Sequence, residues 1–122
     1  MLLTLALPQL NDLMLTGIIG TLHVAEGTEM TPGSKLLDVT VDLSDVAPQD
    51  CPPVSYYRIA VRERVWLRRL DVAAGDDVPT GTVLAHFSTD PDEPLDAPSA
   101  RPLRVTIAGI LGDSEGWGEE PS

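Results

Sequence analysis

The chain has 122 residues and a formal net charge of -11, from 19 acidic and 8 basic side chains. This length fits one domain that can bury a core without covalent cross-links. An acidic chain repels phosphate groups, so we expect neither nucleic acid nor an anionic membrane as a partner. Cys51 is the only cysteine, which excludes an intrachain disulfide and favours a reducing, cytoplasmic location. The apolar start, Met1 to Leu7, lacks the basic residues of an export signal, and no apolar run reaches the ~20 residues of a transmembrane helix.

Short segments rich in branched apolar residues predict β-strands, because proline and glycine separate them and no window shows a helical period. In chain order, the expected strands are Leu2–Leu7, Ile18–Ala25, Lys35–Asp42, Tyr56–Arg62, Val65–Ala73, Thr82–Ser88 and Leu103–Ile110. The pattern predicts one all-β domain over residues 1–111.

Three stretches are predicted to be irregular. Ser44–Ser55 and Asp90–Pro102 are rich in proline, which cannot donate the hydrogen bonds of a sheet. Gly112–Ser122 is acidic and rich in glycine, so we expect a disordered C-terminal tail.

The sequence also contains an internal repeat. Val24–Val39 (VAEGTEMTPGSKLLDV) matches Val72–Phe87 (VAAGDDVPTGTVLAHF) without a gap, at an offset of 48 residues. The coinciding positions are Gly27 and Gly75, Gly33 and Gly81, Met30 and Val78, Leu36 and Leu84, and Val39 and Phe87. Since glycine adopts the positive φ of tight turns at little cost, each copy is expected to contain two glycine turns around one buried apolar residue. Two copies related by a pseudo-twofold axis would form a flattened barrel or sandwich of two sheets.

This repeat resembles the biotinyl/lipoyl-type carrier domains, and it is most similar to the lipoyl domains of 2-oxo acid dehydrogenase acyltransferases. The second half of the resemblance begins near Val65 and runs to Thr89. In the first half, the family's order and spacing are met without a gap by Pro8, Leu10, Gly17, Ile19, Glu26, Gly27, Gly33, Leu36, Val39 and Asp42. The resemblance implies a single-hybrid-type fold whose two halves are joined by a hairpin.

The departures from the family concern that hairpin. The family's modified lysine follows the aspartate that Asp42 matches, but Leu43 stands there. A leucine cannot form the amide that holds lipoate or biotin, so we expect no cofactor at the usual position. The joining segment is also longer and richer in proline than the family's tight turn. Leu103–Ile110 adds a strand beyond the family's usual end.

Two regions are candidate docking surfaces for a protein partner. Arginine, tyrosine and tryptophan dominate interaction hot spots, and alternate positions from Arg62 to Arg68 would share one strand face. The loop after Asp42 is the second candidate, because binding residues concentrate on loops of rigid sheets. The candidate docking residues are Asp42, Leu43, Cys51, Tyr56, Tyr57, Arg62, Arg64, Trp66 and Arg68. The alternative for the arginine face is a solvated surface paired with carboxylates, and the alternative for the loop is a tolerated insertion without function.

Catalytic and metal-binding patterns are weak. His23 and His86 are not equivalent in the repeat, since His23 matches Asp71 and His86 matches Asp38. We therefore expect no catalytic residues and no metal site.

The first functional hypothesis is a non-catalytic protein-interaction or accessory subunit, with homo-oligomerisation left open. The second is a carrier or enzyme accessory with a group attached at Lys35 or Cys51. The third, the lipoyl-like part of a periplasmic adaptor, is disfavoured because the joining segment is short and non-helical.

Overall fold

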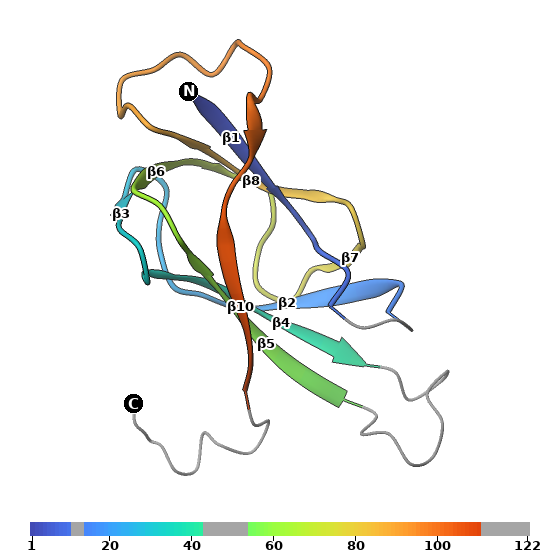
Figure 1. Cartoon of the computed structure of the whole chain (residues 1–122). Helices are drawn as coiled ribbons and strands as arrows, with labels where there is room; N and C mark the ends of the chain where they lie inside the picture. Colours follow the sequence, from blue (N-terminus) through green and yellow to red (C-terminus); the bar gives the residue numbers. More distant parts are fainter. Residues whose placement is uncertain (11–13, 43–53, 111–122) are drawn as a thin grey trace.

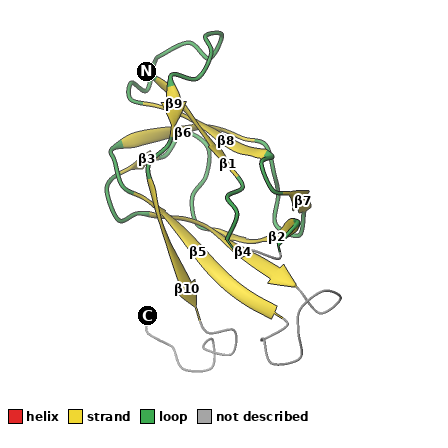
Figure 2. Cartoon of the chain, turned by 45° about the vertical axis from the view of Figure 1, so that its right-hand side comes forward, coloured by secondary structure: helices red, strands yellow, loops and turns green. Residues whose placement is uncertain are grey.

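The computed structural model describes residues 1–10, 14–42 and 54–110. These residues form two five-stranded sheets and no helix (Figures 1 and 2). The strands are β1 Leu2–Ala6, β2 Thr16–Leu22, β3 Glu29–Met30, β4 Lys35–Asp42, β5 Val54–Val61, β6 Val65–Leu70, β7 Asp77–Pro79, β8 Val83–Ser88, β9 Arg101–Pro102 and β10 Val105–Ile110. The prediction of an all-β domain with two sheets is confirmed. Each sheet keeps two edge strands, so the architecture is a sandwich.

The strand order shows how the two halves of the repeat are interlocked. Sheet A has the order β3-β6-β8-β1-β9, and sheet B has the order β10-β5-β4-β2-β7. The short strand β3 of the first half pairs with β6 of the second half. In return, β7 of the second half pairs with β2 of the first. Each half therefore completes the sheet of the other.

The strand registers repeat with the 48-residue offset of the sequence. In the short pairs, Met30 lies opposite Val65, and Val78 lies opposite Gly17. The long pairs match as well, because Ile19 opposite Val39 corresponds to Leu67 opposite Phe87. Hydrogen bonds between the halves follow the same rule: the amide of Gly27 donates to the carbonyl of Leu67 at 2.6 Å, and that of Gly75 donates to Ile19 at 2.7 Å. The internal repeat is thus a structural pseudo-symmetry.

The repeated glycines occupy equivalent turns, as predicted. Gly27, Gly33, Gly75 and Gly81 all have a positive φ, between 90° and 95°. Residues with a Cβ rarely adopt this conformation. The four glycines therefore set the turns on either side of β3 and β7.

The core lies between the sheets and contains the predicted apolar residues. Met30 and Val78, the residues between the glycine turns, are 1% and 9% exposed, so their predicted burial is confirmed. Val39 and Phe87, also equivalent in the repeat, are fully buried. Burying a side chain of this size contributes about 1.5–3 kcal/mol, so both halves supply comparable parts of one core.

The chain after β8 breaks the pseudo-symmetry. β9 joins sheet A in parallel with β1, and β10 joins sheet B antiparallel to β5. Leu103 lies between these strands, is 5% exposed, and donates its amide to the carbonyl of Thr4 at 2.8 Å. The predicted extra strand is therefore present as β10, and the chain passes from sheet A to sheet B between β9 and β10 (Figure 2).

Several predicted boundaries need correction. The strands β3, β7 and β9 were not predicted, and β9 lies inside the stretch predicted to be irregular, Asp90–Pro102. Val54 and Ser55, also predicted to be irregular, begin β5. The rest of Ser44–Ser55 and the predicted tail Gly112–Ser122 lie outside the described residues. In the part that the structure describes, no helix is long and apolar enough to cross a membrane.

Candidate functional site

The connection between β4 and β5 is the segment where the sequence resemblance places the lost attachment position. Asp42 at the end of β4 lies opposite Val54 at the start of β5. Leu43 follows Asp42 directly, although Leu43 and Cys51 themselves lie outside the described residues. Lys35, at the other end of β4, is exposed, and seven residues of strand put it roughly 23 Å from Asp42. A group on Lys35 would be carried at the opposite end from the hairpin.

Tyr56 and Tyr57 near this hairpin end face opposite sides of sheet B. Tyr57 is partly buried and packs against the core, on the same strand face as the fully buried Ile59. Tyr56 is half-buried on the outer face, the same face as Val54, which is 36% exposed. Of the two predicted tyrosines, Tyr56 is therefore the one available at the outer surface.

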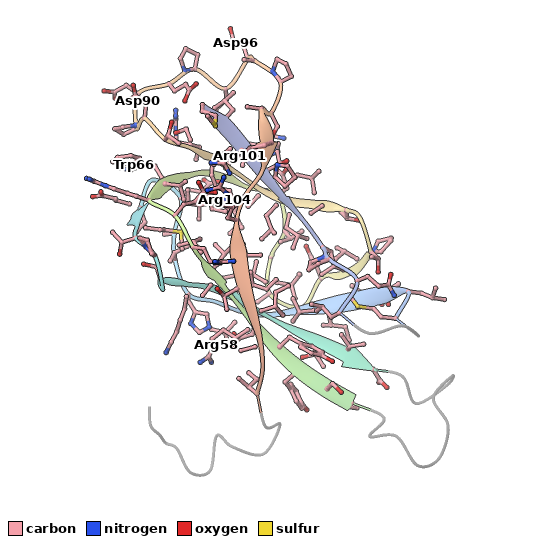
Figure 3. All side chains as sticks on the ribbon, viewed as in Figure 1. Arg58, Trp66, Asp90, Asp96, Arg101 and Arg104 are labelled. Atoms are coloured by element: carbon pink, nitrogen blue, oxygen red, sulfur yellow. The ribbon has the colours of Figure 1, made fainter. Side chains whose placement is uncertain are left out.

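The outer face of sheet B carries a polar cluster that the sequence did not predict as a site. The Nε2 of His23 lies 3.0 Å from the Oδ1 of Asp38. From β5, Arg58 donates its Nε to the same oxygen at 2.9 Å and its Nη2 to Oδ2 at 3.3 Å (Figure 3). Burial raises the pKa of Asp38, but the hydrogen bonds with Arg58 and His23 together lower it by more, so the pKa of Asp38 lies below its usual range. Asp38 is thus held as a carboxylate.

Sheet A carries the equivalent cluster with the two partners exchanged. The Nε2 of His86 lies 2.9 Å from the Oδ2 of Asp71, and the Nε of Arg69 donates to Oδ1 at 2.7 Å. His86 occupies the repeat position of Asp38, and Asp71 occupies that of His23. The histidines are not equivalent, as predicted, but the two His–Asp pairs are. The signal was present in the sequence, since each histidine is aligned with an aspartate.

Each cluster links neighbouring segments of its sheet through side-chain hydrogen bonds. Each histidine is oriented by a carboxylate, as in a general base. In the part of the chain that the structure describes, no serine, threonine or cysteine side chain is hydrogen-bonded to either ring. The same residues contain no group of three or more His, Cys, Asp or Glu side chains that could hold a metal ion.

The residues of the predicted arginine face do not all lie on one strand. Arg62 lies in the β5–β6 turn, so it does not share a strand face with Trp66, and that prediction is wrong. Arg64 precedes β6, pairs with Glu29 of β3, and places its guanidinium 5.5 Å from the centre of the Trp66 ring. Arg64 and Trp66 form a small exposed corner with Glu29, which we call the β6 corner.

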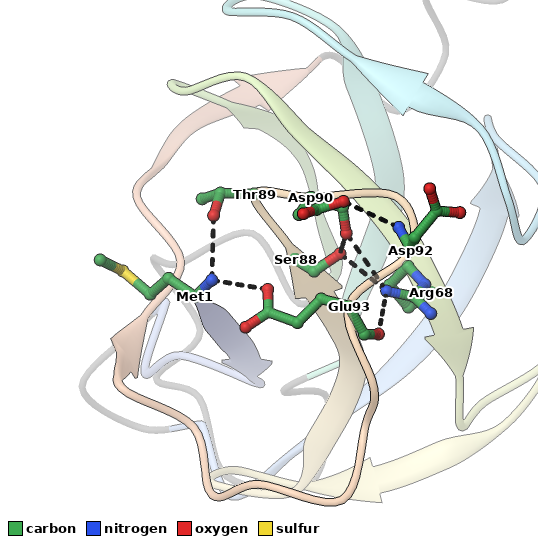
Figure 4. Close-up of polar contacts among 7 residues, drawn as sticks. All are labelled: Met1, Arg68, Ser88, Thr89, Asp90, Asp92 and Glu93. Carbon is green, nitrogen blue, oxygen red and sulfur yellow. Dashed lines mark hydrogen bonds and ion pairs between the residues drawn. The ribbon is translucent and has the colours of Figure 1, made fainter.

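Arg68 is an internal anchor for the segment between β8 and β9, residues 89–100, which we call the arm. Its Nη1 donates to the Oγ of Ser88 at 3.0 Å, and to the carbonyls of Asp90 and Glu93 at 3.3 and 2.6 Å (Figure 4). The amino group of Met1 binds the Oε1 of Glu93 at 2.5 Å. Arg68 therefore fixes the arm to β6 through hydrogen bonds within the chain.

A second anchor fixes the start of the C-terminal strands. Arg101 donates two hydrogen bonds to Glu63 in the β5–β6 turn, at 2.6 and 2.8 Å, and the amide of Arg104 donates a third at 2.9 Å (Figure 3). The hydrogen bonds from Arg101 lower the pKa of Glu63 to about 2. These two side-chain anchors thus reinforce the attachment of residues 89–104 to the sandwich, beside the pairing of β9 with β1.

Comparisons with protein-family models, with curated proteins and with solved structures gave no match.

Proposed function

We propose that this chain is a non-catalytic protein-interaction or accessory module, built on a lipoyl/biotinyl-type framework, that presents its β4–β5 hairpin to a protein partner. The observation that carries the proposal is the hairpin itself. It joins the two halves of a pseudo-symmetric sandwich, which is where the resembled family carries its lysine. In this chain, β4 ends at Asp42 and the next residue is Leu43.

The strands beneath the hairpin suit a docking role. β4 lies inside sheet B between β5 and β2, and its Val39 and Val41 are at most 1% exposed. Binding loops work best when a rigid element fixes their direction. At the base of the hairpin, Val54 and Tyr56 leave apolar surface that a partner can cover.

The proposed loss of the carrier role rests on chemistry. Lipoate and biotin are held through an amide to an amine, and a leucine side chain has none. Lys35 has an amine, but its position at the far end of β4 does not reproduce the presentation of a group on the hairpin. The carrier alternative with Lys35 or Cys51 is therefore ranked second.

The intact mass of the protein, purified from its native host, tests this loss. We expect the mass of the unmodified polypeptide. A mass increase that matches lipoyl or biotinyl on most molecules would contradict the proposal. Peptide mapping would then locate the group on Lys35 or elsewhere.

The docking role is tested by shortening the hairpin. Because Asp42 and Val54 already pair, residues 43–53 can be replaced by the two residues Asn-Gly, which favour a tight hairpin turn. We expect this variant to keep its melting temperature and to lose the partners that the full chain captures from its host. The matched control, Trp66→Ala, alters the β6 corner and should keep those partners. The reverse result, with partners lost only in Trp66→Ala, would move the docking surface to the β6 corner.

A further inference from the structure

The four sheet edges of the sandwich are unequal. In sheet A the edge strands are β3 and β9, of two residues each, and in sheet B the short edge is β7, of three residues. Both β7 and β9 end in a proline. Short edges and prolines are the usual means by which proteins prevent pairing between sheets. β10, the fourth edge, has six residues with the sequence VTIAGI, and it contains neither proline nor charge.

One set of backbone groups on β10 faces away from the sheet. Val61 exchanges hydrogen bonds with Gly33 and Ser34, on the side of β4. Neighbouring residues of an antiparallel ladder alternate in direction, so Ala60, Arg58 and Tyr56 face β10. Their partners there are Thr106, Ala108 and Ile110.

The alternate residues of β10, Val105, Ile107 and Gly109, therefore direct their amides and carbonyls outward. Within the described residues, no backbone hydrogen bond outside the strand ladders involves these three. Ile107 is also among the large apolar side chains that remain exposed, at 40%. The edge offers both a row of polar backbone groups and an apolar side chain.

We propose that the chain forms a homodimer in which β10 pairs antiparallel with β10 of a second copy, centred on Ile107. In this register Ile107 meets Ile107 of the second copy, and Val105 meets Gly109. All the outward backbone groups are then satisfied, with about six hydrogen bonds between the copies. The two isoleucine side chains cover each other on the same face of the joined sheet.

Charge favours a second copy as the occupant. The chain carries a net charge of -11, so a dimer must keep carboxylates away from its contact. Self-pairing of β10 does this, because the strand itself has no charge. At each end the exposed Arg104 lies opposite the uncharged Ile110 of the second copy, so no like charges face each other across the paired strands.

The dimer contact is distinct from the hairpin end and extends the proposed function. Because the two β10 strands run in opposite directions, the hairpins of the two copies point to opposite ends of the dimer. Such a dimer would offer two docking sites and bind a repeated partner with higher avidity.

The mass in solution tests the dimer, by light scattering and by sedimentation over a range of concentrations. We expect the full chain to have twice the chain mass. Ile107→Pro removes an outward amide without removing a bond to β5, so it should give a folded monomer. The matched control, Thr106→Lys, keeps every outward amide and should remain dimeric. If Ile107→Pro fails to fold, Ile107→Lys serves instead, since it places two cations opposite each other and should raise the dimer dissociation constant at least about tenfold.

Two results would overturn the proposal: a full chain that stays monomeric throughout the micromolar range, or a folded Ile107→Pro that stays dimeric. A monomer that dimerises only after removal of residues 111–122 would show that the chain's own C-terminal segment occupies the edge, and it would overturn the dimer of the full chain. The variant with the shortened hairpin should remain dimeric while it loses its partners. The failure of either proposal can therefore be recognised separately.

Discussion

The first half of the repeat runs from β2 to β4 and continues into the β4–β5 hairpin, whereas the second half runs from β6 to β8 and continues into the arm. Within the halves, the registers of the strands and the positive φ of the glycines coincide. After the halves, one connection is a hairpin and the other returns over Met1 to β9 and β10 (Figure 1). The comparison shows that the turns and buried positions are shared by the two halves, while the connections that follow each half differ.

The His–Asp clusters show a subtler difference between the halves. The pair itself is retained on the outer face of each sheet, but histidine and aspartate have changed places. The arginine also comes from different positions: Arg58 reaches Asp38 from the neighbouring strand, whereas Arg69 lies two residues before Asp71. The framework thus preserves the contact rather than the residue at each position.

A charge at the buried position between the two glycine turns should have the largest effect on stability. We expect Met30→Asp and Val78→Asp each to lower the free energy of unfolding by several kcal/mol, because each would bury an unpaired carboxylate. Urea unfolding measures this, and Met30, at 1% exposed, should suffer more than Val78, at 9%. The exposed Thr28→Asp, which copies Asp76 of the second half, should cost less than about 0.5 kcal/mol. If Val78→Asp lowers the free energy of unfolding by less than ~1 kcal/mol, Met30 and Val78 are not equivalent positions.

The glycine turns allow a matched test of the symmetry. Gly27→Ala and Gly75→Ala should each cost about 1–2 kcal/mol, because alanine is strained at φ values of 90° and 95°. An added Cβ meets no atom within 4 Å at either site, so backbone strain is the only expected cause. Gly109→Ala, in β10 without a positive φ, should be nearly neutral in thermal unfolding. Costs that differ by more than about 1 kcal/mol between Gly27 and Gly75 would break the equivalence of the turns.

The sequence could predict this framework because glycine turns and buried apolar positions leave strong local signals. It could not predict β3 and β7, because strands of two or three residues are too short to show an alternating pattern. It also could not predict the role of Arg68. The period of a strand places that side chain on the outer face, but only the three-dimensional path of the arm brings the carbonyls of Asp90 and Glu93 to it.

The candidate site was predicted in part. The resemblance predicted a hairpin after Asp42, and the structure pairs Asp42 of β4 with Val54 of β5. The His–Asp clusters were missed because each is formed by residues 15 positions apart that no local motif connects. Only the exchange of histidine and aspartate between the repeats could have indicated them.

Glu63 holds the C-terminal strands, which follow the second half and have no counterpart after the first half. The pKa of Glu63 is lowered from 4.5 to about 2, so its ionised form favours the folded state above pH 4.5, and this stabilisation is lost as the pH falls toward 2. Glu63→Gln should lower the free energy of unfolding by about 1 kcal/mol at neutral pH, since water screens the partly exposed ion pair of Glu63 and Arg101. The variant should also depend less on pH between 4.5 and 2 than the parent does. Equal pH dependence in the two proteins would show that Arg101 does not hold Glu63 in solution.

The smallest expected effect distinguishes the two His–Asp clusters. Asp38→Asn and Asp71→Asn should each cost less than about 1 kcal/mol, because partly exposed ion pairs contribute little. Asp38→Asn should cost more, since Asp38 is 17% exposed against 27% for Asp71 and accepts two hydrogen bonds from Arg58. Both carboxyl groups have a lowered pKa, so both contributions should be present at neutral pH and disappear as the pH falls below the usual aspartate pKa. Chemical unfolding at pH 7 and at pH 3 measures this, and the two variants should approach the parent at pH 3. A larger loss for Asp71→Asn would mean that the arginine from the neighbouring strand contributes less than the one on the same strand, and that burial does not set the difference between the clusters.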